Sequence, residues 1–116
     1  MLQKVIEQLP ASIVTYAATV NTDGYIKEVD PAVLAEIREK CVVPAVKGLA
    51  AEGRPYKGVL YAGLMIDDDG PKLIEYNTRF GDPECQVMCM RLKSDLLDLL
   101  LACAEGRLAK TKAEWR

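Results

Sequence analysis

The chain contains no histidine among its 116 residues. Histidine is the most frequent general base in enzymes, and it activates the nucleophile in Ser-His and Cys-His arrangements. Its absence excludes these arrangements within this sequence. Any chemistry that the chain performs must therefore depend on carboxylates, arginine, lysine and bound metal.

The chain also lacks a dominant sign of charge. Its 15 Lys and Arg residues nearly balance its 17 Asp and Glu residues, so the formal net charge is −2. Such a weak net charge produces no strong field that would attract nucleic acid or an anionic membrane. We therefore expect neither of these partners and favour a small ligand or a protein.

Long apolar runs and targeting signals are missing as well. The apolar runs are much shorter than the roughly 20 residues that a membrane-spanning helix needs. The first residues lack the basic-then-apolar order of a signal peptide. We therefore expect a cytoplasmic protein without membrane contact. Half of the residues are apolar, and no repeat or linker divides the sequence, so we expect residues 1–116 to form a single domain with its own core.

No CxxC pair occurs among the four cysteines, and the lack of histidine removes the other usual zinc ligand. A cytoplasmic setting also argues against disulfides, so we expect free thiols. Cys85 and Cys89 are one helical turn apart beside Val87, Met88 and Met90, which predicts that both are buried or half-buried. The remaining two cysteines are Cys41 and Cys103.

Several segments have the spacing of a helix or a strand. Residues 2–9 predict a short helix that ends at Pro10, and residues 12–20 predict a strand followed by a turn at 21–24. Asp30 and Pro31 are a helix start, and the helix should run to about Gly53. It should kink or restart near Val43, because Pro44 cannot donate a backbone hydrogen bond.

Residues 58–77, "GVLYAGLMIDDDGPKLIEYN", contain two apolar runs joined by a turn at 67–71 and predict a β-hairpin. Gly63 in the first run indicates that another backbone or a ligand comes close. Helical spacing returns after Glu84, and a final helix should begin at Ser94–Asp95 and end near Gly106. These elements predict an α+β fold in which the hairpin packs against the 30–52 helix and the C-terminal helix, with both of its faces covered.

The second strand of this hairpin suggests a metal site. Residues two apart on a strand point to the same face, so Glu75 and Asn77 should project together. Magnesium prefers hard oxygen ligands and usually takes only one or two protein carboxylates plus phosphate oxygens. If the extended conformation continues to Arg79, its guanidinium would lie beside those phosphates and offset charge in a phosphoryl transfer.

The residues that follow predict a sharp turn at the end of the strand. Gly81 can adopt positive φ, Asp82 can bond to its own backbone, and Pro83 fixes the turn. Asp82 and Glu84 are also candidates for binding an amine, because a carboxylate at the rim of a phosphate site does not help an anion. The spacing alone fits a solvated network of ion pairs as well as it fits a metal–nucleotide site.

The sequence nevertheless resembles one family. Residues 55–108, with the strand "YKGVLYAGLM", the strand "EYN", the loop "RFGDPE" and the segment "LKSDL", resemble the C-terminal part of the ATP-grasp domain of phosphoribosylamine-glycine ligase, also called glycinamide ribonucleotide synthetase. The segment "DPAVLAEIREKCVVPAVKGLAAEG" resembles its preceding helix. The resemblance covers about residues 29–110, whereas residues 1–28 match poorly.

The resemblance implies a ligase that joins glycine to 5-phosphoribosylamine in purine biosynthesis, with ATP as co-substrate and glycyl phosphate as the intermediate. It implies that Glu75 and Asn77 bind Mg²⁺ (or Mn²⁺) and that Arg79 acts at the phosphates. It also implies that Gly81, Asp82 and Pro83 shape the substrate end of the pocket. The run from Leu60 to Leu64 offers no further carboxylate, which favours this family over other ATP-grasp enzymes.

The glycine-rich stretch and the lid of the family are absent, so we expect a fragment that is inactive alone. Two alternatives stay open. The chain could belong to another ATP-grasp carboxylate-amine ligase or kinase with a different acceptor. It could also be a non-catalytic module that associates with itself through exposed apolar surface.

Overall fold

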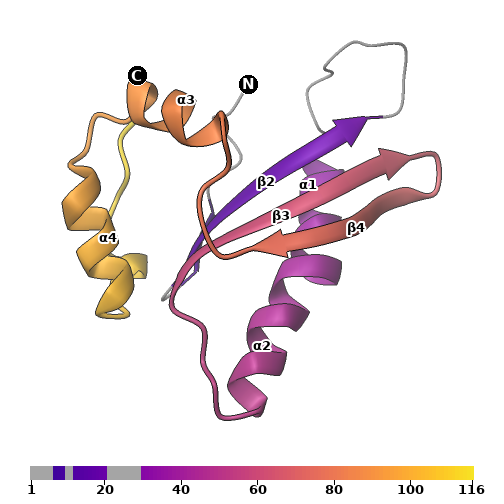
Figure 1. Cartoon of the computed structure of the whole chain (residues 1–116), viewed down its shortest axis with the longest axis horizontal. Helices are drawn as coiled ribbons and strands as arrows, with labels where there is room; N and C mark the ends of the chain where they lie inside the picture. The colour runs from indigo at the N-terminus through magenta and orange to yellow at the C-terminus, as the bar shows by residue number, and fades with distance from the viewer. Residues whose placement is uncertain (1–6, 10–11, 21–29) are drawn as a thin grey trace. The chain divides into compact units, whose positions relative to one another are not determined.

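The structure is a computed structural model that describes residues 7–9, 12–20 and 30–116, with side chains from Asp30 onward. It has the α+β class that the sequence predicts (Figure 1). The strands follow the order β1-β2-β3-β4 in one sheet. Their bounds are β1 (Glu7–Leu9), β2 (Ser12–Val20), β3 (Gly58–Asp67) and β4 (Gly70–Asn77). The helical segments are α1 (Pro31–Ile37), η2 (Arg38–Val42), α2 (Val43–Ala51), α3 (Glu84–Arg91), α4 (Leu96–Ala104) and η3 (Leu108–Lys110).

The N-terminal prediction is partly wrong. Residues 7–9 form β1 and pair antiparallel with β2, with Glu7 opposite Val14 and Leu9 opposite Ser12. A helix of eight residues is marginal by itself in water, whereas pairing with β2 supplies partners for the backbone groups. The other part of the expected 2–9 helix and the turn at 21–24 lie outside the described residues. The strand predicted at 12–20 is confirmed as β2.

The chain forms two compact units. The first comprises Met1–Thr15, Lys57–Tyr61 and Asn77–Arg116, and the second comprises Tyr16–Tyr56 and Ala62–Tyr76. Both hairpin strands therefore contribute to each unit.

In the second unit, the helix start at Asp30 is confirmed. The Asp30 carboxylate accepts a hydrogen bond of 2.7 Å from the Ala32 backbone N–H, and Pro31 occupies the first turn. The restart that Pro44 predicts is confirmed as well. The π-helical segment η2 ends where the Val43 N–H donates to the Arg38 carbonyl, five residues back, and α2 begins at Val43. This wider turn accommodates a residue that cannot donate to the carbonyl four residues back.

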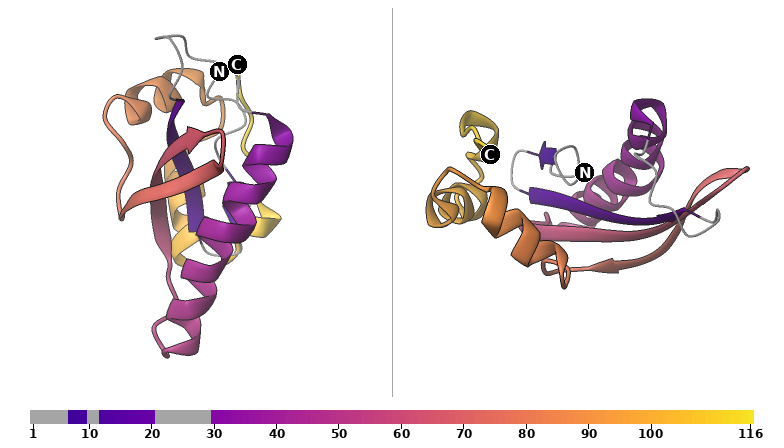
Figure 2. Two further views of the ribbon diagram at one scale, coloured as in Figure 1. Left: turned by 90° about the vertical axis from the view of Figure 1, so that its right-hand side faces the viewer. Right: turned by 90° about the horizontal axis from the view of Figure 1, so that it is seen from above.

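The hairpin of β3 and β4 is confirmed, and its strands run antiparallel (Figure 1). The consecutive helical segments α1, η2 and α2 lie over one face of the hairpin (Figure 2). The buried side chains of this unit include Ile37, Val42, Ala62 and Leu64. The expectation that both faces of both strands are covered is wrong for β4, because β4 is the edge strand and most of its side chains are exposed.

In the first unit, a core cluster forms around α4. It consists of Leu92, Leu99, Ala102, Cys103 and Leu108, with Val59, Phe80, Leu96, Ala113 and Trp115 packed against it. Asp95 begins α4 by accepting a 2.7 Å hydrogen bond from the Leu97 N–H, and Gly106 closes it at φ +72°. Val59 of β3 belongs to this cluster, so the predicted packing of the hairpin against the C-terminal helix is confirmed for the start of β3.

The C-terminal residues form a feature that the sequence does not predict. Trp115 bridges antiparallel to Leu92, and the Lys93 N–H donates to the Glu114 carbonyl at 2.8 Å. The Ser94 hydroxyl accepts from the Glu114 N–H at the same distance. This pairing fixes the tail beside the segment between α3 and α4.

All four cysteines are free thiols. Cys41 and Cys103 are buried and Cys85 is half-buried, but Cys89 is exposed, so the expected burial is wrong for Cys89. Within the described part of the chain, no helix has the length and apolar character needed to cross a bilayer.

Candidate functional site

The candidate metal ligands lie on β4, where the strand period places Glu75 and Asn77 on one face. Glu75 is exposed and Asn77 is half-buried. The described residues contain no group of three His, Cys, Asp or Glu side chains that could hold a metal ion. One carboxylate with one amide oxygen nevertheless fits magnesium, which retains waters and binds phosphate oxygens at its other positions.

Gly63 makes room for the Glu75 side chain. A Cβ atom at position 63 would lie 3.1 Å from the Glu75 Cγ and 3.8 Å from its Oε1. The neighbours of this position are therefore the Glu75 side chain and, at 3.7 Å, the backbone carbonyl of Glu75 on the adjacent strand. Because Gly63 has no side chain, the Glu75 side chain can lie across the sheet surface.

Tyr76 holds the same strand from its opposite face. Its hydroxyl donates a 2.6 Å hydrogen bond to the Cys41 carbonyl in η2. Partial burial, together with the nearby Cys41 thiol, raises the pKa of Tyr76 above its ordinary value. The phenol thus stays protonated and ties β4 to the helix, which fixes the strand that positions Glu75.

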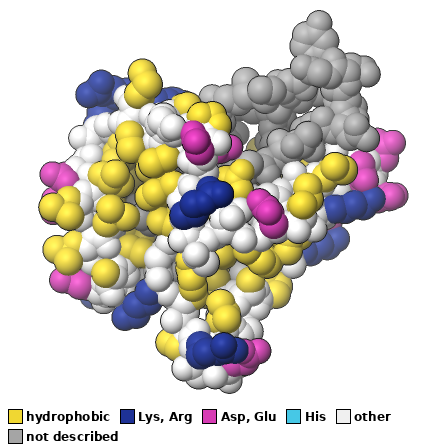
Figure 3. Space-filling model, in the orientation of Figure 1, with side chains coloured by type: hydrophobic (Ala, Val, Ile, Leu, Met, Phe, Trp, Pro, Cys, Tyr) yellow, Lys and Arg dark blue, Asp and Glu magenta, His cyan; other side chains and the backbone are white. Residues whose placement is uncertain are grey.

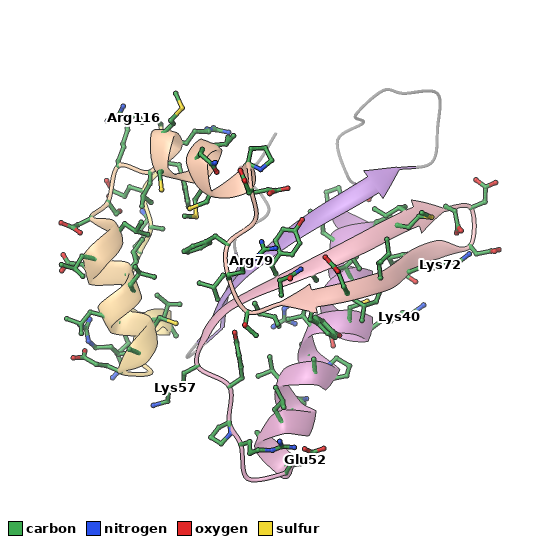
Figure 4. All side chains as sticks on the ribbon, viewed as in Figure 1. Lys40, Glu52, Lys57, Lys72, Arg79 and Arg116 are labelled. Carbon is green, nitrogen blue, oxygen red and sulfur yellow. The ribbon has the colours of Figure 1, made fainter. Side chains whose placement is uncertain are left out.

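Arg79 lies in the loop beyond the end of β4 (Figure 4). Its Nη1 donates to the Phe80 carbonyl at 2.9 Å, and the side chain is exposed. Because β4 ends at Asn77, the strand period does not extend to Arg79. The expected position of Arg79 beside phosphates therefore stays a prediction.

Gly81 is required for a reason other than the one that the sequence suggests. It is not among the glycines with positive φ, so that expectation is wrong. Gly81 is buried, and a Cβ atom would lie 2.7 Å from the Tyr61 Cε2 and 2.8 Å from the Glu84 Cδ, with the Glu84 Oε2 nearer still. Close packing against Tyr61 and Glu84, and not a left-handed backbone, excludes a side chain here.

The two candidate amine ligands differ. The Asp82 carboxylate accepts a 2.7 Å hydrogen bond from the Gln86 Nε2, one helical turn away. The Glu84 Oε2, by contrast, is buried without a hydrogen-bond partner, the one such side-chain atom among the described residues. The peptide bond between Asp82 and Pro83 is cis. Glu84 is therefore the stronger candidate for receiving a donor from outside this loop.

Sequence reasoning missed Tyr61 and Gln86. The spacing of Asp82 and Gln86 by four residues could have indicated their hydrogen bond, because such residues are neighbours on a helix. No local signal indicates that Tyr61 contacts Gly81, because the contact joins residues distant in sequence.

Comparisons with known proteins identify the family of the chain. Residues 20–85 match the family model of the phosphoribosylglycinamide synthetase ATP-grasp (A) domain, which is more than half of the chain. The chain is 56% identical over 86 residues to the phosphoribosylamine–glycine ligase of Agrobacterium fabrum, covering 74% of this chain and 20% of that protein. It is 57% identical over 90 residues to the enzyme of the same name from Rhizobium meliloti, covering 74% and 21% respectively.

A more distant relative gives the same result. The ligase of this name from Vibrio parahaemolyticus is 53% identical over 88 residues, which cover 75% of this chain and 20% of that protein. The chain thus spans about a fifth of the length of these curated relatives. The match confirms the resemblance that the hairpin and the "RFGDPE" loop indicated, and the chain belongs to the phosphoribosylglycinamide synthetase ATP-grasp (A) domain family.

Proposed function

We propose that this chain is the part of a phosphoribosylamine-glycine ligase that holds Mg²⁺ (or Mn²⁺) against the phosphates of ATP. The intact ligase would join glycine to 5-phosphoribosylamine through glycyl phosphate, in the cytoplasm. The observation that carries this proposal is the edge strand β4, on which Glu75 and Asn77 share a face while Gly63 leaves space for the Glu75 carboxylate. An exposed edge is accessible to a nucleotide.

Each residue has a role in this proposal. Glu75 and Asn77 would hold the metal, which would neutralise phosphate charge as the phosphoryl group is transferred. The Arg79 guanidinium would approach the same phosphates. Gly81, Asp82 and Pro83 would shape the end of the pocket that receives substrate. Glu84, with its buried unpartnered oxygen, would face the amine donor.

Positioning supplies most of the rate in phosphoryl transfer, so a metal held from one side is insufficient. The sequence contains no glycine-rich loop that would clamp the phosphates from the other side. The polypeptide alone should therefore bind Mg-ATP weakly and release no phosphate.

A chimeric enzyme tests the proposal. The 86 matching residues of the Agrobacterium fabrum ligase would be replaced by those of this chain, and phosphate release from ATP would be measured with glycine and phosphoribosylamine. The chimera should turn over, whereas Glu75→Ala and Asn77→Ala should lower kcat at least tenfold, because each change removes an oxygen from the metal.

Asp68→Ala is the matched control, because Asp68 is an exposed carboxylate in the turn of the same hairpin. This variant should retain the turnover of the chimera. Unchanged turnover in Glu75→Ala would contradict the proposed metal site. Phosphate release by the isolated chain would contradict the proposal that it is an incomplete part of the ligase.

Self-association is a second candidate property, and the surface of α4 favours it. Leu97 and Leu101, one turn apart, are 71% and 47% exposed. Figure 3 shows hydrophobic side chains gathered over α3 and α4. Sedimentation velocity should show dimers or larger species that Leu97→Lys/Leu101→Lys dissociates, while Ala104→Lys at an exposed position of the same helix does not. A monomer at millimolar concentration would exclude this property.

A further inference from the structure

Helix α3 presents two thiols that the proposed ligase chemistry does not use. Cys85 and Cys89 are separated by one helical turn of α3, which places them on the same helix face. Cys89 is exposed and Cys85 is half-buried. The other two thiols are buried, and the Cys103 Sγ donates to the Gly58 carbonyl at 3.7 Å. Solvent thus reaches a pair of adjacent thiols on one helix face.

The helical spacing disfavours a direct disulfide between them. Cβ atoms four residues apart on a helix are about 5–6 Å apart, whereas a disulfide requires roughly 3.5–4.5 Å. A single atom bound to both sulfurs spans a longer distance. Metal–sulfur bonds of about 2.3 Å in a tetrahedral arrangement place the two sulfurs about 3.8 Å apart, a separation that side chains one helical turn apart can reach by rotation about their Cα–Cβ bonds.

The surroundings of the pair favour a soft ligand over a hard one. Partial burial, followed by the neighbouring Cys89 thiol and the charge of Asp82, raises the pKa of the Cys85 thiol. The Cys85 thiol therefore loses its proton most readily to a ligand that binds sulfur strongly. The neighbouring Asp82 carboxylate is already bonded to Gln86. Hard cations such as magnesium prefer oxygen and would not displace these protons.

We propose that Cys85 and Cys89 form a chelating dithiol site for thiophilic centres that take two sulfur ligands, such as trivalent arsenicals. The reaction with phenylarsine oxide is a condensation without redox change. Two arsenic–sulfur bonds form, the arsenic–oxygen bonds break, and the two thiol protons leave with the oxygen as water. Arsenic remains trivalent throughout.

Binding at this site would act on the loop proposed to receive substrate. The Cys85 N–H donates to the Gly81 carbonyl at 3.0 Å, so the first turn of α3 is bonded directly to that loop. The thiol site itself, however, depends only on α3 and does not rest on the ligase function.

The test uses the folded chain, one equivalent of phenylarsine oxide and excess glutathione, which competes through single thiols. Intact mass should show one phenylarsenic group added with loss of two hydrogens. Trypsin cleaves after Arg79 and Arg91, so the adduct should appear on the peptide 80–91, which contains both thiols and no other cysteine. A dithiol such as dimercaptopropanol should remove it.

Cys85→Ser and Cys89→Ser should each lower adduct retention under glutathione at least tenfold. Cys89→Ser/Met90→Cys is the matched control, because Met90 is 76% exposed and the variant keeps four thiols but moves one to another helix face. It should lose the adduct as well. An adduct on Cys41 or Cys103, or equal retention in the Met90→Cys variant, would overturn the proposal. The wild-type peptide map decides this even where a variant fails to fold.

Discussion

The two strands of the hairpin differ sharply although a two-residue turn joins them. β3 buries Leu60, Ala62 and Leu64 on one face, whereas β4 exposes most of its side chains, Ile74 to 62%. β4 also contains Glu75 and Asn77. The comparison teaches that stability and the proposed chemistry are divided between neighbouring strands: β3 anchors the sheet, and β4 presents the proposed metal ligands at its edge.

Truncating one apolar side chain on each strand should give the largest difference between the strands in the free energy of unfolding. Leu64→Ala should lower the free energy of unfolding by about 2–4 kcal/mol, because Leu64 is 1% exposed and leaves a cavity. Ile74→Ala should cost less than about 1 kcal/mol, because this side chain is already mostly in water. Urea unfolding of both variants measures the difference. Equal losses would show that β4 is covered and that the division is incorrect.

Removing the tie between β4 and η2 should have an intermediate effect. Tyr76→Phe deletes the donor to the Cys41 carbonyl and should lower stability by about 1 kcal/mol. Hydrogen exchange of the β4 amides should rise more than that of the β3 amides, because the tie holds the edge strand. A uniform rise across both strands would instead indicate global destabilisation alone.

Gly63→Ala should lower metal affinity while leaving the stability of the fold nearly unchanged. The new Cβ would crowd the Glu75 Cγ, whose side chain is exposed and can move, while alanine removes the entropic cost of glycine in a strand. Unfolding free energy should therefore change by less than about 1 kcal/mol, yet metal affinity should fall. Unchanged affinity for Mn²⁺ would show that the Glu75 position does not depend on this glycine.

The smallest effect should come from the ion pair at the hairpin turn. Lys72 donates to the Asp67 carboxylate at 2.5 Å, which lowers the pKa of Asp67, and the same pair raises the pKa of Lys72. Because the folded-state pKa of Asp67 is lowered, the ion pair stabilises the fold above about pH 4, and this stabilisation is lost as the pH falls through the folded-state pKa. Because the pKa of Lys72 is raised, the stabilisation persists up to about pH 10.

Lys72→Ala should therefore lower the urea midpoint slightly at pH 7, less at pH 2, and less again in 1 M salt, because Lys72 is exposed and Asp67 is only half-buried. A loss that is the same at pH 2 and pH 7 would exclude the ion pair as its cause.

Much of the fold could be predicted from local signals. Asp30–Pro31, Pro44, the apolar runs around Asp67–Gly70 and the Asp95 cap each specify their element through nearby backbone chemistry. The predicted helix is wrong at residues 7–9 because pairing with the next strand, β2, overrides a short apolar pattern. The site is harder to predict for another reason. The spacing of Glu75 and Asn77 is visible in the sequence, but the contacts of Gly81 with Tyr61 and of Tyr76 with Cys41 are not, because they join distant segments.

The most direct test of the central claim, that the edge strand β4 holds a divalent metal, is paramagnetic broadening of backbone amide NMR signals by Mn²⁺. Broadening should centre on Glu75 and Asn77 and extend to Gly63, whose backbone lies beneath the Glu75 side chain. Glu75→Gln should remove it, and Asp68→Asn should not. Broadening that centres on the acidic turn at residues 67–69 and persists in Glu75→Gln would contradict the account.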